Sequence, residues 1–275
     1  MKTIRSVLLH VDATPSSVAR LEFARGFALR HGAELSAMWV AGSAQLRTPV
    51  ASAERPAVLR QPIESAEQRA TPWSDGAHVG DGSQIRWLQS SSADTVETFC
   101  QQALYADLLV LGQHDPSAAL AGGEPAGFLE SVLIATDKPA LILPHEGKFE
   151  THSRNVVIGW NATPEAARAM SVALPWLRSA DRVHVLEAGD ASEQHHAGAL
   201  DIAQYLRFHN IEPELHRHRA SVSDVGEALL SLSGEVGADL LVMACYRHSR
   251  LRELMLGGAS RSLLRTMTLP VLIAH

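Results

Sequence analysis

The chain has 275 residues, of which 46% are hydrophobic and 20% charged, a balance typical of a folded globular protein and not of a disordered one. The formal net charge of −6 disfavours nucleic acid as a partner, because binding to a polyanion needs a basic surface. The sequence has two cysteines, Cys100 and Cys245, so a disulfide framework is excluded and a reducing compartment is expected.

The N-terminal segment is a short apolar run that ends at Asp12, too early for a secretory signal peptide, and no small-residue cleavage site follows it. Nowhere do 18 apolar residues occur together, so the sequence predicts no membrane-spanning helix. Both observations favour a cytoplasmic protein.

Three short segments recur along the chain in the same order, which indicates an internal duplication. The distance between the copies is 149 residues for the first pair, 132 for the second and 131 for the third, so the first copy is longer in its middle. The paired segments are 11–15 with 160–164, 106–111 with 238–243, and 138–143 with 269–274.

In the first copy, short apolar runs alternate with amphipathic segments, a pattern that predicts strands joined by helices. Residues 42–82 are rich in Ala, Ser, Gly and Pro, so we expect a mobile flap there, with one short helix near 64–70 and no regular strand. The expected strands are 4–11, 34–40, 85–89, 108–112 and 140–143, and the expected helices run from Pro15 to about His31, over 93–105 and over 128–135.

The second copy shows the same alternation without an insertion. Strands alternating with crossover helices predict an α/β fold with a parallel sheet that is covered on both faces. Ligands of such sheets bind outside the carboxyl ends of the strands, where the strand order reverses. The expected strands are 156–160, 182–187, 214–218, 240–244 and 271–274, and the expected helices are 164–178, 192–209, 224–236 and 261–267.

The stretch 238–261 combines an apolar strand, a basic loop, a glycine pair and a helix start. Glycines let a ligand approach the backbone closely, and the free N–H groups of a helix N-terminus attract anions, so this order favours phosphate binding. The stretch resembles the C-terminal signature of the universal stress protein family, whose nucleotide-binding members carry G-x2-G-x9-G-[ST]. The spacing is kept, although Ala244 and Arg247 replace two of the glycines and Gly258 replaces the hydroxyl residue, with Ser260 two positions later.

The resemblance implies two tandem, doubly wound, parallel five-stranded sheets with strand order 3-2-1-4-5, a universal stress protein/adenine nucleotide alpha hydrolase-like fold. We expect a first domain over 1–146 with a degenerate site, and a second over 152–275 with a partly retained signature. The resemblance implies a stress-response binding module with ATP or AMP as the ligand of the second domain. It also implies that the two domains pack as a pseudo-dimer, with 140–143 and 271–274 as the strands that can pair across a twofold axis. A homodimer of the whole chain is expected as well.

The candidate nucleotide site of the second copy lies between its first and fourth strands. Asn161 stands where nucleotide-binding relatives commonly carry an Asp near the adenosine. Arg247 either fills the phosphate space or pairs with a phosphate, and a solvated basic face formed with Arg250 and Arg252 is the structural alternative. The candidate residues are Asn161, Ala162, Thr163, Ala244, Arg247, His248, Arg250, Gly257, Gly258, Ala259, Ser260 and Arg261.

The first copy keeps Asp12 and Gly112, the two family residues that the second copy lacks. However, Asp115 stands at the second glycine position, and a carboxylate there repels phosphate. We therefore expect no triphosphate site in the first copy.

Several histidines raise the question of a metal site, because His216 and His218 share one face of a strand and His184 lies on another strand. No carboxylate or cysteine stands at an evident ligand spacing, so we expect scattered surface histidines and no metal site. No general base or magnesium-binding carboxylate pair is expected near Gly257, so no catalytic residue is predicted. A slow ATP hydrolase and a dimerisation scaffold without nucleotide remain as alternatives.

Overall fold

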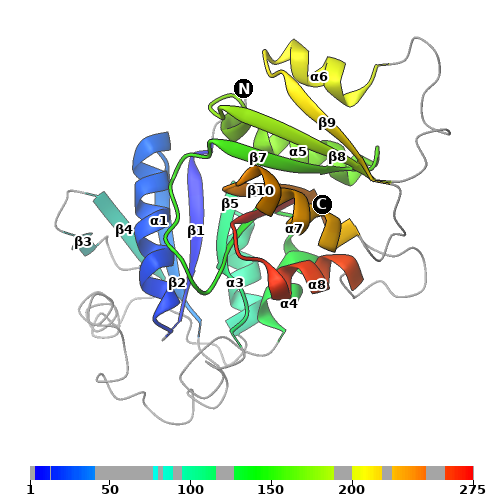
Figure 1. Cartoon of the computed structure of the whole chain (residues 1–275). Coiled ribbons are helices and arrows are strands. Elements are labelled where there is room, and N and C mark those ends of the chain that lie inside the picture. The colour runs from blue at the N-terminus through cyan, green and yellow to red at the C-terminus, as the bar shows by residue number, and fades with distance from the viewer. Residues whose placement is uncertain are drawn as a thin grey trace. The chain divides into compact units, whose positions relative to one another are not determined.

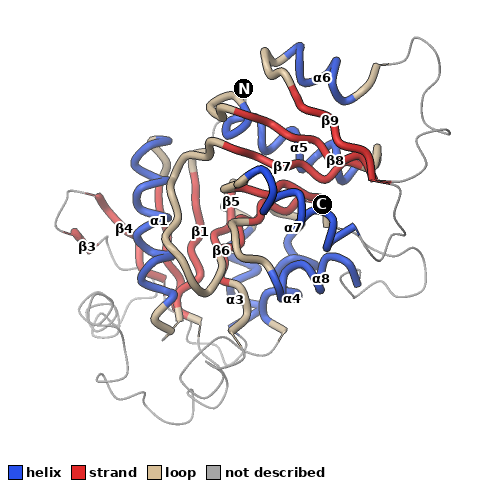
Figure 2. The backbone as a smooth tube through the Cα atoms, in the orientation of Figure 1, coloured by secondary structure: helices blue, strands red, loops and turns tan. Residues whose placement is uncertain are grey.

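The computed structural model describes residues 4–12, 14–40, 77–79, 83–88, 95–115, 127–188, 200–218, 225–245 and 258–274. The chain forms two compact units, Met1–Thr151 and His152–His275. Their helices and strands are labelled in Figure 1 and coloured by type in Figure 2. None of the described helices is long and apolar enough to cross a membrane.

The sheet of the N-terminal unit has the strand order β3-β4-β2-β1-β5-β6. All neighbouring strands in it are parallel except β3 and β4, so the five parallel strands have the predicted order 3-2-1-4-5. The elements are β1 (Ser6–Val11), α1 (Ser16–His31), β2 (Glu34–Trp39), β3 (Ala77–Val79), β4 (Ser83–Leu88), α3 (Thr95–Ala103), β5 (Leu108–Gly112), α4 (Phe128–Thr136) and β6 (Ala140–Leu143).

The short strand β3 corrects the expectation that 42–82 contains no regular strand. Its backbone pairs antiparallel with β4, with Ala77 opposite Ile85 and Val79 opposite Ser83. This pairing satisfies backbone groups along the open edge of β4, so a tertiary neighbour and not local propensity makes the strand. The short helix expected near 64–70 falls outside the described residues.

The sheet of the C-terminal unit has the order β9-β8-β7-β10-β11, and all its neighbouring strands are parallel. This is again the predicted order 3-2-1-4-5, so the tandem doubly wound fold is confirmed. The elements are β7 (Asn155–Trp160), α5 (Pro164–Leu177), β8 (Arg182–Ala188), α6 (Ile202–Phe208), β9 (Pro213–His218), α7 (Val225–Val236), β10 (Leu240–Ala244), α8 (Gly258–Thr266) and β11 (Val271–Ala274).

Two helices of the C-terminal unit begin at other residues than expected. Helix α6 begins at Ile202 and not near 192, because Asp201 caps it by accepting a hydrogen bond from the Gln204 backbone N–H at 2.7 Å. Helix α8 begins at Gly258, one turn before the expected start. Its buried residues Ser260, Leu263 and Leu264 recur at helical spacing, so the apolar stripe continues into the first turn.

Different helices cover the two faces of the C-terminal sheet. A Cβ added to Gly159 would lie 3.0 Å from Leu229 Cδ1, so α7 packs on the face to which Gly159 points. The next residue, Trp160, points to the other face and lines a cavity with residues of α5 and α6. Since Leu186 lies opposite Gly159 in the register, His184, two residues earlier on β8, belongs to the α7 face.

Candidate functional site

The N-terminal unit buries an ionic cluster where β1 ends beside β5. Asp12 directly follows β1 and is 3% exposed, and its Oδ2 lies 3.2 Å from a guanidinium nitrogen of Arg20. Its Oδ1 accepts hydrogen bonds from the Thr14 backbone N–H at 2.9 Å and from the Ser17 hydroxyl at 2.6 Å. The carboxylate therefore has its hydrogen-bond and ionic partners within its own unit.

The Arg20 guanidinium lies across the carboxyl ends of β1 and β5. Its Nε donates to the His10 carbonyl oxygen at 2.9 Å, and its Nη2 donates to Ser17 Oγ at 2.7 Å. A Cβ added to Gly112, the last residue of β5, would overlap the guanidinium, whose Cζ would be 2.8 Å away. Arg20 thus occupies the crevice at which the strand order reverses. Its guanidinium can lie this close to the backbone of β5 because Gly112 has no side chain.

Burial and charge together fix the protonation of this cluster. Burial lowers the pKa of His10 to about 3, an effect that the Arg20 charge reinforces and the Asp12 charge opposes. Burial acts to raise the pKa of Asp12, but the charges of Arg20 and His10 and two hydroxyl hydrogen bonds outweigh it and hold this pKa at about 2. At neutral pH Asp12 is an anion, His10 is neutral, and Arg20 supplies the compensating charge.

The matching positions of the C-terminal unit carry small, uncharged side chains. The repeat distances of 149 and 132 residues pair Asp12 with Asn161, Ser17 with Ala166, Arg20 with Ala169 and Gly112 with Ala244. The three alanines are buried, so they belong to the packing beneath the crevice. No arginine stands at the position from which Arg20 fills the N-terminal crevice.

The predicted turn after β7 is held by its own side chains. Thr163 Oγ1 donates to Asn161 Oδ1 at 3.0 Å and accepts from the Ala166 backbone N–H at 3.3 Å, which makes Thr163 the N-cap of α5. Between them, Ala162 has a φ of 53°, a left-handed conformation that costs a residue with a Cβ roughly 1–2 kcal/mol. Strained residues of this kind cluster at ligand-binding turns.

A cavity of about 270 Å³ opens beside this turn, between α5 and α6. Its walls combine aromatic and aliphatic side chains with two carboxylates. The lining residues are Trp160, Ala162, Ala167, Met170, Ser171, Glu187, Leu200, Asp201, Ile202 and Tyr205. Among them only Ala162 was a predicted site residue, because the others come from β7, β8, α5 and the segment 200–205, which are brought together only by the fold.

The first turn of α8 contains the predicted residues Gly258, Ala259 and Ser260. Ser260 is fully buried, and its hydroxyl has no hydrogen-bond partner within the described part of the chain. The same holds for the buried Nε of Arg261. The first N–H groups of any helix also lack intrahelical acceptors, so this turn combines several donors that an anion can satisfy.

The described part of the predicted site converges on one edge of the sheet. The turn 161–163 follows β7, Ala244 ends the neighbouring strand β10, and α8 starts from the same edge before the chain returns to β11. Arg247, His248, Arg250 and Gly257 fall outside the described residues.

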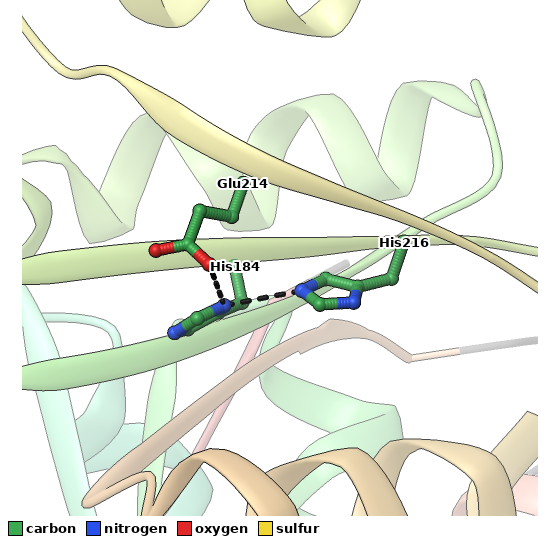
Figure 3. Close-up of side chains that lie close together, drawn as sticks. All are labelled: His184, Glu214 and His216. Atoms are coloured by element: carbon green, nitrogen blue, oxygen red, sulfur yellow. Dashed lines mark hydrogen bonds and ion pairs between the residues drawn. The ribbon is translucent and has the colours of Figure 1, made fainter.

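A second polar cluster lies on the α7 face, between β8 and β9 (Figure 3). His184 Nδ1 lies 3.1 Å from His216 Nε2 and 3.5 Å from Glu214 Oε2. The expectation of scattered surface histidines without a carboxylate partner is wrong here, because the register of the two strands places Glu214 opposite His184, which is fully buried. The signal that the sequence analysis missed is Glu214 itself, two residues before His216 on the same strand face.

Burial and neighbouring charges shift the pKa values in this cluster. Burial lowers the pKa of His184, Glu214 opposes this shift, and His216 and Arg182 add to it. The Arg182 guanidinium forms hydrogen bonds with both carboxylate oxygens of Glu214, at 2.9 to 3.1 Å, and holds the pKa of Glu214 low.

Each unit is thus a doubly wound α/β domain with its crevice at the strand-order reversal. Residues 153–275 match the model of the universal stress protein family, so the C-terminal unit is similar to that family.

A universal stress protein from Synechocystis is 24% identical over 171 residues, which span 60% of this chain and 57% of the relative. The crystal structure of a universal stress protein from Archaeoglobus fulgidus is similar with a TM-score of 0.65 and 15% identity, covering 98% of this chain and 95% of its own. A putative universal stress protein from Pseudomonas aeruginosa gives a TM-score of 0.60 at 12% identity, covering 98% and 93% of the two chains. At such identities the structural likeness establishes the tandem fold alone.

Proposed function

We propose that this chain is a stress-response binding module whose C-terminal domain, 152–275, binds an adenine nucleotide, ATP or AMP. The N-terminal domain, 1–146, takes no nucleotide because Arg20 fills its crevice. The observation that carries the proposal is the first turn of α8, where the buried hydroxyl of Ser260 has no partner among the described residues. The similarity of 153–275 to the universal stress protein family supports the role of a binding module, and the geometry supports the kind of ligand.

The phosphates would lie at the first turn of α8. Gly258 permits close approach to the backbone, the helix N-terminus favours negative charge, and the Ser260 hydroxyl is a donor for a phosphate oxygen. The position that matches Arg20 is Ala169, so the guanidinium that fills the N-terminal crevice has no counterpart at that position here.

The nucleoside would lie toward the turn after β7 and the adjoining cavity. A volume of about 270 Å³ is just below the roughly 300–1,000 Å³ of sites for whole drug-sized ligands, so the cavity suits one part of a nucleotide. Trp160 and Tyr205 offer aromatic surface, and Glu187 lies near the end of the second strand of the unit. A carboxylate in this position holds ribose hydroxyls in related doubly wound folds.

Isothermal titration calorimetry with ATP and with AMP tests the proposal on the full chain. We expect one site per chain with micromolar affinity. A hydrogen bond to a charged group contributes about 1.5–3 kcal/mol, so Ser260→Ala should weaken binding by about tenfold or more. Ser262→Ala, an exposed serine two residues further along the same helix, is the matched control and should bind as the native chain does.

Unfolding measurements on the same variants separate binding from folding. Removing a buried hydroxyl that lacks a partner should leave the free energy of unfolding unchanged or higher, so weaker binding cannot then be ascribed to misfolding. Equal ATP affinity in Ser260→Ala, or two sites per chain, would contradict the proposal. No binding in the native chain would favour the dimerisation scaffold, steady phosphate release would favour a hydrolase, and light scattering tests the expected homodimer.

A further inference from the structure

We propose that His184, Glu214 and His216 form a binding site for a zinc-class divalent metal ion between β8 and β9 of the C-terminal unit. The ligand atoms are His184 Nδ1, His216 Nε2 and Glu214 Oε2, which all lie within 4.8 Å of one another. Figure 3 shows the Glu214 carboxylate and the His216 ring converging on the same ring nitrogen of His184. The site lies on the α7 face, away from the cavity between α5 and α6, and does not depend on the proposed nucleotide site.

The spacing of these atoms is close to that of a tetrahedral metal site. Zinc lies roughly 2.0–2.1 Å from its nitrogen and oxygen ligands, so neighbouring ligand atoms in a tetrahedron are about 3.3–3.4 Å apart. The two separations from His184 Nδ1, 3.1 Å to His216 and 3.5 Å to Glu214, bracket that value, and the third, between His216 and Glu214, is at most 4.8 Å. An ion can therefore enter through small side-chain rotations without a change in the strands.

The ligand types select the metal. Two imidazole nitrogens and one carboxylate oxygen suit zinc and its neighbours in the transition series, whereas magnesium and calcium require oxygen ligands.

The strands and one neighbouring side chain hold the ligands in place. His184 and Glu214 lie opposite each other in the parallel register, and His184 is fully buried and cannot swing out to solvent. Arg182 Nε and Nη2 donate to Glu214 Oε1 at 3.0 and 2.9 Å. A metal on Oε2 would replace only the 3.1 Å bond from Nη2 to that oxygen, so the carboxylate stays oriented. The charge of Arg182 also weakens attraction for a cation, which predicts micromolar rather than nanomolar affinity.

The side chain of Glu214 is 49% exposed, so the site opens toward solvent. Among the described residues, the ligand group has three members, which leaves a fourth tetrahedral position for water or for a donor from another molecule. A bound ion would also link the edge strand β9 to β8. It would raise the free energy of unfolding of this unit as the occupancy of the metal site increases.

Calorimetric titration of the chelator-treated full chain with zinc chloride tests this site. We expect one ion per chain, and a loss of affinity of about 100-fold in His216→Ala and in Glu214→Gln, since even outer contacts of a metal site contribute 10–100-fold. His218→Ala is the matched control, because His218 lies two residues further along β9 and is not a member of the group. Cobalt(II) provides a second readout, as its visible absorption identifies tetrahedral coordination.

The expected result is a tetrahedral cobalt band in the native chain and in His218→Ala, and its loss in His216→Ala. Circular dichroism spectra identical to that of the native chain would show that the variants are folded. The proposal would be overturned if the native chain binds no zinc, if His216→Ala binds zinc as the native chain does, or if magnesium chloride competes equally. The His184–His216 contact would then be an ordinary hydrogen bond between two imidazole rings.

Discussion

Replacing Gly112 by alanine should disrupt the buried cluster of the N-terminal unit. The three heavy atoms nearest to the added Cβ all belong to the Arg20 guanidinium, which the methyl group would overlap. Arg20 is 3% exposed and is held by the His10 carbonyl, the Ser17 hydroxyl and the Asp12 carboxylate. The guanidinium therefore cannot move aside without giving up these bonds.

The size of the effect follows from these contacts. Separating a buried ion pair costs about 3–5 kcal/mol. Alanine recovers only about 0.5–1 kcal/mol relative to glycine in a strand, because it has less backbone entropy to lose on folding. We expect Gly112→Ala to lower the free energy of unfolding of this unit by about 3 kcal/mol.

The C-terminal unit suggests the compensating variant. Its residues at the matching positions are Asn161, Ala169 and Ala244. In an Asp12→Asn/Arg20→Ala background, the methyl group of Gly112→Ala meets no guanidinium and leaves no buried charge unpaired. Adding the third substitution there should change the free energy of unfolding by less than about 1 kcal/mol, and the difference between the two backgrounds measures the coupling.

Native-state hydrogen exchange with mass spectrometry measures both effects in the full chain, because peptides report on each unit separately. A loss of 3 kcal/mol corresponds to about 150-fold faster exchange of the β5 amides, with the β10 amides as the internal reference. The reasoning is refuted if Gly112→Ala exchanges within threefold of the native rate, or if the loss is equally large in the Asp12→Asn/Arg20→Ala background.

Two further predictions concern protonation and capping. Folding lowers the pKa of His10 from 6.5 to about 3 and that of Asp12 from 3.8 to about 2, so the unfolded chain binds protons more readily. The free energy of unfolding should therefore decrease as the pH falls below 6.5, because of His10, and decrease further between pH 3.8 and 2, because of Asp12. Urea unfolding should show a slope of up to about 1.4 kcal/mol per pH unit for each group, and His10→Phe should lack the part above pH 3.8. Thr163→Ala removes the cap of α5 and should lower the free energy of unfolding by about 1 kcal/mol, whereas Ser171→Ala on the exposed side of that helix should change it by less than about 0.5 kcal/mol.

Much of the fold is predictable because strand identity here is a local property. The apolar runs 108–112 and 240–244 recur at the repeat distance, and both become fully buried strands at the centre of their sheets. The candidate site follows from the topology in the same way, since the turn 161–163 and Ala244 lie at the ends of adjacent strands. These parts require no knowledge of the side-chain packing.

The remaining features depend on contacts between distant residues. Glu214 meets His184 only through the register of two parallel strands, and β3 forms only because β4 offers it an edge.

A local signal for the start of α6 was present, because Asp201 and Gln204 have the spacing of a capping box. A signal for Arg20 was present too, since helical spacing places it on the apolar stripe of α1, where a charge needs a buried partner.

The arginine in the N-terminal crevice is a counterion tethered to the backbone. An ion drawn from solution can be diluted, exchanged or displaced by salt, whereas Arg20 is present at one equivalent per chain and lies where salt screens its charge only weakly. The charge of Asp12 is thereby compensated whatever the concentrations of free ions around the protein. The C-terminal repeat has Ala169 at the matching position and carries no such built-in counterion there.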